Sequence, residues 1–163
     1  MPPSPSAHGG SRRGRPLQLI PSVSQTMSVD EEHGPCLKTF ATLCVYPPAG
    51  MSTETVSEAL ALAPSSIQEG SGPLPRAWFL STEGRVDSRD VRHHIDWILD
   101  RVAPSAQGLG GLQQQGARAV IFCYWLSRNG HGGPTLSPRQ TSALGMLQLD
   151  CGFDVYFGGV IAG

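Results

Sequence analysis

The chain has 163 residues, a hydrophobic fraction of 39% and a formal net charge of −1 at pH 7. This length allows one domain with a hydrophobic core. The near-neutral charge and the lack of a basic stripe in the sequence do not indicate nucleic-acid binding. The sequence has no apolar run of about 18 residues, so no transmembrane helix is predicted. We therefore expect a globular cytoplasmic protein that binds neither nucleic acid nor membrane.

Residues 1–35 differ in composition from the rest of the chain. Pro, Ser, Gly and Arg dominate them, whereas apolar periodicity begins only afterwards. A segment of this composition cannot bury a core, so the sequence predicts a disordered tail over 1–35, a single domain over 36–157 and a short tail over 158–163. Met27 is an alternative translation start to Met1.

The four cysteines, at positions 36, 44, 123 and 151, show no metal-binding pattern. None belongs to a Cys-x-x-Cys pair or to a Cys/His spacing typical of zinc. Cys44 and Cys123 lie inside apolar runs, where a free thiol behaves as a small buried hydrophobic group. We expect both to be buried and unpaired, Cys36 to be more reactive than either, and no metal or cofactor to be bound.

Four segments are typical of β-strands. Residues 39–46, 77–82, 118–127 and 153–157 are rich in β-branched and aromatic residues, and Gly or Pro follows several of them. The third segment is apolar at both odd and even positions. This pattern predicts a central strand that is covered on both faces.

Helical periodicity connects these strands. Ser52 is predicted to cap a first helix that Pro64 ends, and Ser88 to cap a second one. Pro104 interrupts the second helix. Its continuation over 105–115 contains three glycines, each costing about 1 kcal/mol relative to alanine in a helix, so this piece is predicted to be weak.

The last helix has the clearest start signal. Ser137, Pro138 and Gln140 match a capping box with proline at the first helical position, and Gly152 is predicted to end the helix. The resulting order is β-α-β-α-β-α-β. We expect an α+β fold in which about three helices pack on a mostly antiparallel four-stranded sheet.

Five segments share a pattern of dispersed aromatic and glycine positions: Ala61–Ser66 with the later Gly70, Trp78–Ser81, His94–Asp100, Cys123–Trp125 and Gly152–Tyr156. This pattern, over roughly 39–157, resembles the bacterial domain-of-unknown-function 4279 family. The resemblance implies a small bacterial α+β domain and carries over no activity. Similar sequences tend to be alanine-rich where this chain has glycine at 108, 110 and 111.

The glycine-rich loop over 129–135 is the most informative candidate site. Its backbone N–H groups could face an anion beside the Ser137 helix start, and His131 could act as a base with Ser127 or Asp154 as its partner. A plain connecting loop explains the same glycines more simply. The candidate ligand- or partner-binding residues are Tyr124, Ser127, Asn129, His131, Gly132, Gly133 and Asp154.

Other polar side chains favour structural explanations. His93 and His94 are adjacent in a predicted helix, so their side chains diverge by about 100° and are expected at a solvated or partner-facing edge. Asp154 lies within a short apolar strand. An arginine partner is therefore expected for it, either Arg76 or Arg118.

The sequence shows no catalytic signature such as a Gly-x-Ser-x-Gly elbow. We expect a non-enzymatic bacterial interaction module of the immunity-protein type with a protein partner, by analogy at the level of the fold. The alternative is a small enzyme or ligand-binding protein that uses the loop around His131. A deep pocket holding His131 and two polar partners would favour the enzyme, whereas a flat, apolar, exposed edge would favour the module. The partner and the oligomeric state are left open.

Overall fold

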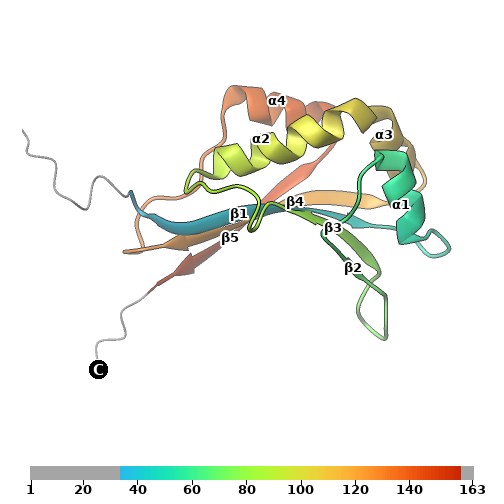
Figure 1. The fold of residues 1–163 in the computed structure, drawn as a ribbon, viewed down its shortest axis with the longest axis horizontal. Coiled ribbons are helices and arrows are strands. Elements are labelled where there is room, and N and C mark those ends of the chain that lie inside the picture. Colours follow the sequence, from blue (N-terminus) through green and yellow to red (C-terminus); the bar gives the residue numbers. More distant parts are fainter. Residues whose placement is uncertain (1–33, 159–163) are drawn as a thin grey trace, which may run out of the picture.

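The computed structural model describes residues 34–158, in which helices cover one face of a five-stranded sheet (Figure 1). The predicted tails over 1–35 and 158–163 lie almost entirely outside these residues. The elements, in chain order, are β1 (Cys36–Tyr46), α1 (Thr53–Leu60), β2 (Ser66–Gln68), β3 (Ala77–Ser81), α2 (Val91–Val102), the 3-10 turn η1 (Ala103–Ser105), α3 (Ala106–Gln114), β4 (Arg118–Ser127), α4 (Pro138–Met146) and β5 (Asp150–Phe157).

The sheet has the spatial order β2-β3-β1-β4-β5. The central strand β1 pairs antiparallel with β3 and β4, and β3 pairs antiparallel with β2. β5 lies parallel to β4, because α4 connects the two strands as a crossover. The predicted α+β class is confirmed, but the predicted four-stranded, mostly antiparallel sheet is in fact a five-stranded mixed sheet.

The extra strand, β2, lies between Pro64, the predicted end of the first helix, and the predicted strand over 77–82, where no strand was expected. It has only three residues, Ser66–Gln68, two of which are exposed, and it pairs with β3 alone. So short a segment shows no alternation of apolar and polar residues, which is the signal that identifies a half-buried strand in a sequence.

The helix starts follow local capping chemistry. Ser52 accepts a hydrogen bond from the Thr55 N–H and caps α1, as predicted. The predicted capping box of α4 is also confirmed, since the Ser137 hydroxyl accepts from the Gln140 N–H and the Gln140 side chain accepts from the Ser137 N–H. At α2 the cap is Asp90 rather than Ser88, because the Asp90 carboxylate accepts from the Arg92 N–H.

The end of α4 was predicted too late in the chain. The helix ends at Met146, and Gln148 takes a positive φ of 51° that turns the chain into β5. Gly152, predicted to end the helix, lies inside β5. A Cβ at Gly152 would lie 2.8 Å from the Phe122 ring, so this glycine leaves room for that ring on the neighbouring strand.

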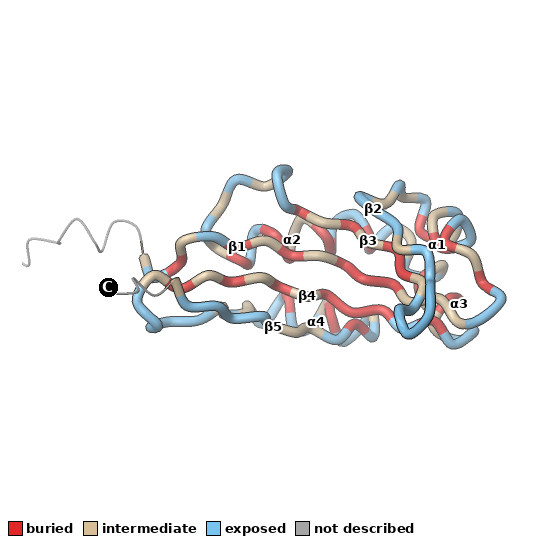
Figure 2. Tube along the Cα trace, turned by 90° about the horizontal axis from the view of Figure 1, so that it is seen from below, coloured by how far each residue is buried: buried red, intermediate tan, exposed pale blue. Residues whose placement is uncertain are grey.

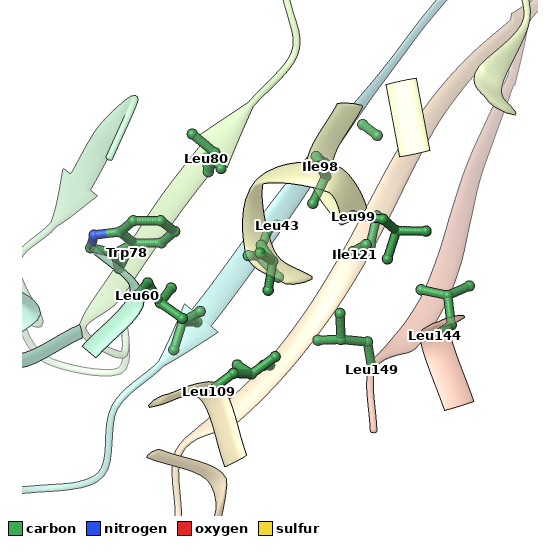
Figure 3. Close-up of a cluster of buried hydrophobic side chains, with 14 of the residues drawn as sticks. Leu43, Leu60, Trp78, Leu80, Ile98, Leu99, Leu109, Ile121, Leu144 and Leu149 are labelled. Carbon is green, nitrogen blue, oxygen red and sulfur yellow. The ribbon is translucent and has the colours of Figure 1, made fainter. Parts of the chain in front are cut away.

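The hydrophobic core lies between the helices and one face of the sheet (Figure 3). Leu43 from β1, Ile121 from β4 and Ile98 from α2 are fully buried in it. Trp78 on β3 is also fully buried, and its Nε1 donates a hydrogen bond to the Ser57 hydroxyl of α1 at 2.9 Å. The core therefore joins the first and second helices to the three inner strands.

The adjacent histidines of α2 have different environments. His93 is exposed, whereas His94 is only 1% exposed, so the expectation that both lie at a solvated or partner-facing edge was wrong for His94. Its Nδ1 lies 2.7 Å from the Thr82 hydroxyl, and its Nε2 donates to the Ser88 carbonyl oxygen at 3.0 Å. Thr82 in turn accepts from the Ala41 N–H, which links α2 to β1.

Candidate functional site

One face of the sheet carries no helix in the described part of the chain; we call it the bare face (Figure 1). Side chains alternate along a strand, and the core contains Ala41, Leu43 and Ile121, so the residues between these positions point to the bare face. Figure 2 views this side, where β1 and β4 largely alternate between buried and intermediate residues. The bare face is formed mainly by Lys38, Phe40, Thr42, Tyr46, Phe79, Ser81, Phe122, Tyr124, Leu126, Asp154 and Tyr156.

This arrangement corrects the prediction for β4. Its apolar residues on both faces indicated a strand that is covered twice, and the helices cover only the face of Ile121 and Cys123. On the other face Phe122 and Tyr124 are partly exposed. β4 is therefore apolar on both faces although only one of them lies in the core and the other belongs to the bare face.

Three aromatic rings form a row across the bare face. The Phe40 and Tyr124 ring centroids lie 4.8 Å apart with 9° between the ring planes. Tyr124 and Tyr156 follow at 5.1 Å and 28°. These spacings match the distance of about 4.8 Å between neighbouring strands, so the rings stand upright on the sheet and cover one another's faces. We call Phe40, Tyr124 and Tyr156 the aromatic row.

Charges of both signs surround the aromatic row. The Lys38 ammonium lies 5.4 Å from the centroid of the Phe40 ring and 2.6 Å from the Glu83 carboxylate, which raises the pKa of Lys38. Asp154, exposed on β5, is the register partner of Tyr124. The predicted ion pair between Asp154 and an arginine is not present among the described residues, where Arg76 pairs with Glu69 instead.

The sequence-predicted site residues fall into two groups. Tyr124 and Asp154 lie together on the bare face, whereas Ser127 is fully buried and points to the opposite side of β4. Sequence reasoning missed Phe40 and Tyr156. Their place beside Tyr124 depends on the pairing of β1, β4 and β5, which no local pattern contains.

The loop after β4 contains the second group. Asn129, His131, Gly132 and Gly133 are all exposed. The Ser127 hydroxyl donates to the carbonyl oxygen of His131 at 3.1 Å, so it holds the loop backbone and not the imidazole. Gly132 has a φ of 75°, and a Cβ there would lie 2.7 Å from Pro35 Cγ. At Gly132 the loop therefore requires glycine on structural grounds.

Four cavities of residues 34–158 do not include the loop histidine in their linings. A groove of about 330 Å³ runs between α2 and α4, with Leu99 and Ala143 in its lining and Arg139 and Asp100 3.5 Å apart among its residues. A hollow of about 170 Å³ beneath the loop includes Gly133 but none of Tyr124, Ser127, His131 and Asp154. Neither of these two hollows brings His131 together with its proposed polar partners.

All four cysteines are free thiols, and three of them are buried. Burial raises the pKa of Cys36, and it raises the pKa of Cys44 to about 11. Cys151 is partly exposed, and a hydrogen bond with the Cys123 thiol lowers its pKa. The same contact, together with burial, raises the pKa of Cys123. The expected burial of Cys44 and Cys123 is confirmed, but Cys36 is buried as well.

We therefore expect Cys151 to react first with iodoacetamide in the native protein. The thiolate is the nucleophile, and Cys151 combines a lowered pKa with partial exposure. Its rate of alkylation should level off at a lower pH than that of a thiol without such a hydrogen bond. Peptide mass spectrometry gives the order of labelling, and Cys151→Ser should remove the fast phase. Faster labelling of Cys36 than of Cys151 would contradict this expectation.

The comparisons with known proteins identify a family and no individual relative. No curated protein and no solved structure matches the chain. Within the described residues no helix is long and apolar enough to cross a membrane. The family model described as "Domain of unknown function (DUF4279)" matches residues 41–158, which include all five strands of the sheet or parts of them. Because this match covers most of the chain, the protein belongs to the DUF4279 family.

Proposed function

We propose that this chain is a non-enzymatic interaction module of the bacterial cytosol that binds another protein through its bare face. The observation that carries the proposal is the aromatic row, a line of three rings on a sheet face that no described helix covers. Partly exposed apolar and aromatic side chains that gather on one face are typical of protein–protein contact sites.

The orientation of the rings supports a protein partner over a nucleic acid. Bases bind to aromatic platforms by stacking on exposed ring faces. Here Tyr124 lies between Phe40 and Tyr156, so both of its faces are covered and its edge points outward. A neighbouring protein can pack on such edges and accept hydrogen bonds from the tyrosine hydroxyls.

The charges on this face favour the same partner. Lys38 is paired with Glu83, and Asp154 adds a negative charge beside Tyr124, so the face has no cationic stripe for phosphates. An apolar centre with a rim of both signs is instead the usual composition of a protein interface. An immunity-type role, in which a small domain covers a functional surface of its partner, is consistent with this geometry by fold-level analogy.

The alternative function, a small enzyme or ligand-binding protein, would use the loop of His131. The exposed imidazole and the exposed glycines beside it are the observation in its favour. The two proposals place the functional residues on different surfaces, since Thr42 lies on the bare face and His131 on the loop after β4. Variants at these two positions can therefore distinguish them.

A charge placed on the bare face should weaken partner binding. Thr42, at the centre of the sheet, is half-buried and has Ser81 and Phe122 as register partners. Thr42→Lys would require a partner to bury an unpaired ammonium, which we expect to weaken binding by at least tenfold. The measurement is affinity capture from the native host with the full chain, followed by mass spectrometry and titration of the captured protein.

Two variants serve as controls. Gln114→Lys adds the same charge at an exposed position of α3 and should bind the partner as the unmodified chain does. His131→Ala should also keep the partner, with a stability change within about 0.5 kcal/mol. Full retention by a folded Thr42→Lys variant would refute the bare-face proposal. Loss of a bound ligand only in His131→Ala would favour the alternative function.

A further inference from the structure

The two edges of the sheet differ in how they end. β2, at one edge, has three residues, and a strand this short gives a neighbour little to pair with. β5, at the other edge, has eight residues and, within residues 34–158, pairs only with β4. The Gly158 N–H donates to the Ser127 carbonyl at 2.9 Å. In a parallel ladder this places the backbone N–H and C=O groups of Val155 and Phe157 on the outer side of β5.

The side chains at the end of β5 are apolar and exposed on both of its faces. Val155, Tyr156 and Phe157 have exposed fractions of 41%, 52% and 66%. Edge strands of monomeric proteins are usually protected by lysine, by proline or by covering segments, and these three residues include neither lysine nor proline. An exposed apolar edge strand without these protections can pair with another strand.

We propose that the outer edge of β5 pairs antiparallel with the β5 edge of a second copy of this chain, about a two-fold axis at Tyr156. In this register Tyr156 lies opposite Tyr156 of the second copy, and Val155 lies opposite its Phe157. Val155 and Phe157 both turn their backbone groups outward, so they can exchange ladder hydrogen bonds. This inference concerns the edge of the sheet and goes beyond the proposed function of its bare face.

A second copy is the occupant that the chemistry of this edge favours. At the β5 end of the aromatic row the outer face of the Tyr156 ring lacks a neighbouring ring, whereas at the other end the Lys38 ammonium lies 5.4 Å from the Phe40 ring centroid. Tyr156 of the second copy continues the row at the same strand spacing. An axis at Asp154 would place two carboxylates directly opposite each other, which is destabilising. The axis at Tyr156 instead places Asp154 opposite Gly158, so identical strands fit without a charge conflict.

The contact is expected to be weak. Pairing of a few residues at a strand edge covers less than the roughly 1,200 Å² that stable complexes bury. We therefore expect a dimer that forms in the micromolar range of concentration. Sedimentation velocity of the full chain should show a mass that rises with concentration from 17.3 kDa toward twice that value.

Charge substitutions at the axis provide the decisive test. Tyr156→Lys and Tyr156→Glu should each be monomeric, because like charges would face each other across the axis. An equimolar mixture of the two variants should form dimers again, because the charges are then opposite. Met146→Lys is the control: Met146 on α4 is 79% exposed, so the same charge there should leave association unchanged.

Three results would overturn the inference. The first is a monomeric chain at every concentration, which would mean that the β5 edge is covered by another segment or stays unpaired. The second is a dimer that persists in Tyr156→Lys, which would place the contact elsewhere. The third is an equimolar mixture that stays monomeric although each variant is folded by circular dichroism. Thr42→Lys, which tests partner binding by the bare face, should dimerise normally. Failure of the dimer proposal is therefore distinguishable from failure of the proposed function.

Discussion

Gly108→Ala is expected to destabilise the protein by about 3 kcal/mol, although alanine is the better helix former. At this position α3 packs directly on the backbone of α1. A Cβ at Gly108 would lie 2.0 Å from the carbonyl oxygen of Ala59 and 2.9 Å from its carbonyl carbon. These are backbone atoms, so the clash cannot be relieved by a side-chain rotation. The two helices would have to move apart.

Two neighbouring glycines provide the matched controls. A Cβ at Gly110 or Gly111 would meet no atom within 4 Å. Alanine at either position should therefore be neutral or should stabilise the protein by up to about 1 kcal/mol. Urea unfolding followed by circular dichroism gives the three free energies. Equal values for Gly108→Ala and Gly110→Ala would show that α1 and α3 do not approach this closely.

His94→Ala should cost about 3 kcal/mol of folding free energy. The substitution removes a buried ring and leaves a cavity under α2. It also leaves the Ser88 carbonyl oxygen, which accepts from Nε2 at 3.0 Å, without this donor. The Thr82 hydroxyl loses its contact at 2.7 Å with Nδ1 but keeps its hydrogen bonds to Ala41. The cavity and the unpaired carbonyl therefore account for most of the expected loss.

The neighbouring histidine is the natural control for this variant. His93 is exposed, and its Nδ1 lies 2.8 Å from the Ser88 hydroxyl. His93→Ala should change the free energy of unfolding by about 0.5 kcal/mol or less, as expected for a surface substitution. Both variants can be compared in the same urea titrations. Similar free energies for His93→Ala and His94→Ala would contradict the buried position of His94.

Local chemistry made several elements predictable. Ser52 and the Ser137–Gln140 capping box were identified because a cap depends on residues that are close in sequence. The burial of His94 could also be predicted from local sequence spacing. It lies three residues after Val91 and four before Ile98, both on the apolar stripe of α2, and that spacing places it on the inward face. The adjacency of His93 and His94 alone does not show that one of them lies on the apolar stripe of α2.

The candidate site was only partly predictable, because its geometry depends on strand pairing. Tyr124 and Asp154 were identified one by one, and their neighbours Phe40 and Tyr156 were not. Rings on three strands become a row only when the register aligns them, and that register depends on contacts between distant parts of the chain. The loop, in contrast, has a clear glycine signal. At Gly132 the structure explains that signal by a positive φ and close packing on Pro35.

The position of β1 in the sheet has a consequence for the synthesis of the protein. β1 is the first strand of this sheet to be made, yet it occupies the centre of the sheet and pairs with β3 and β4. On the nascent chain β1 therefore lacks one of its two neighbouring strands until β4 has left the ribosome. Folding is expected to be slow and dominated by contacts between distant residues. A ribosome that stalls before β4 would release a chain whose longest strand is unpaired on one side and prone to aggregation.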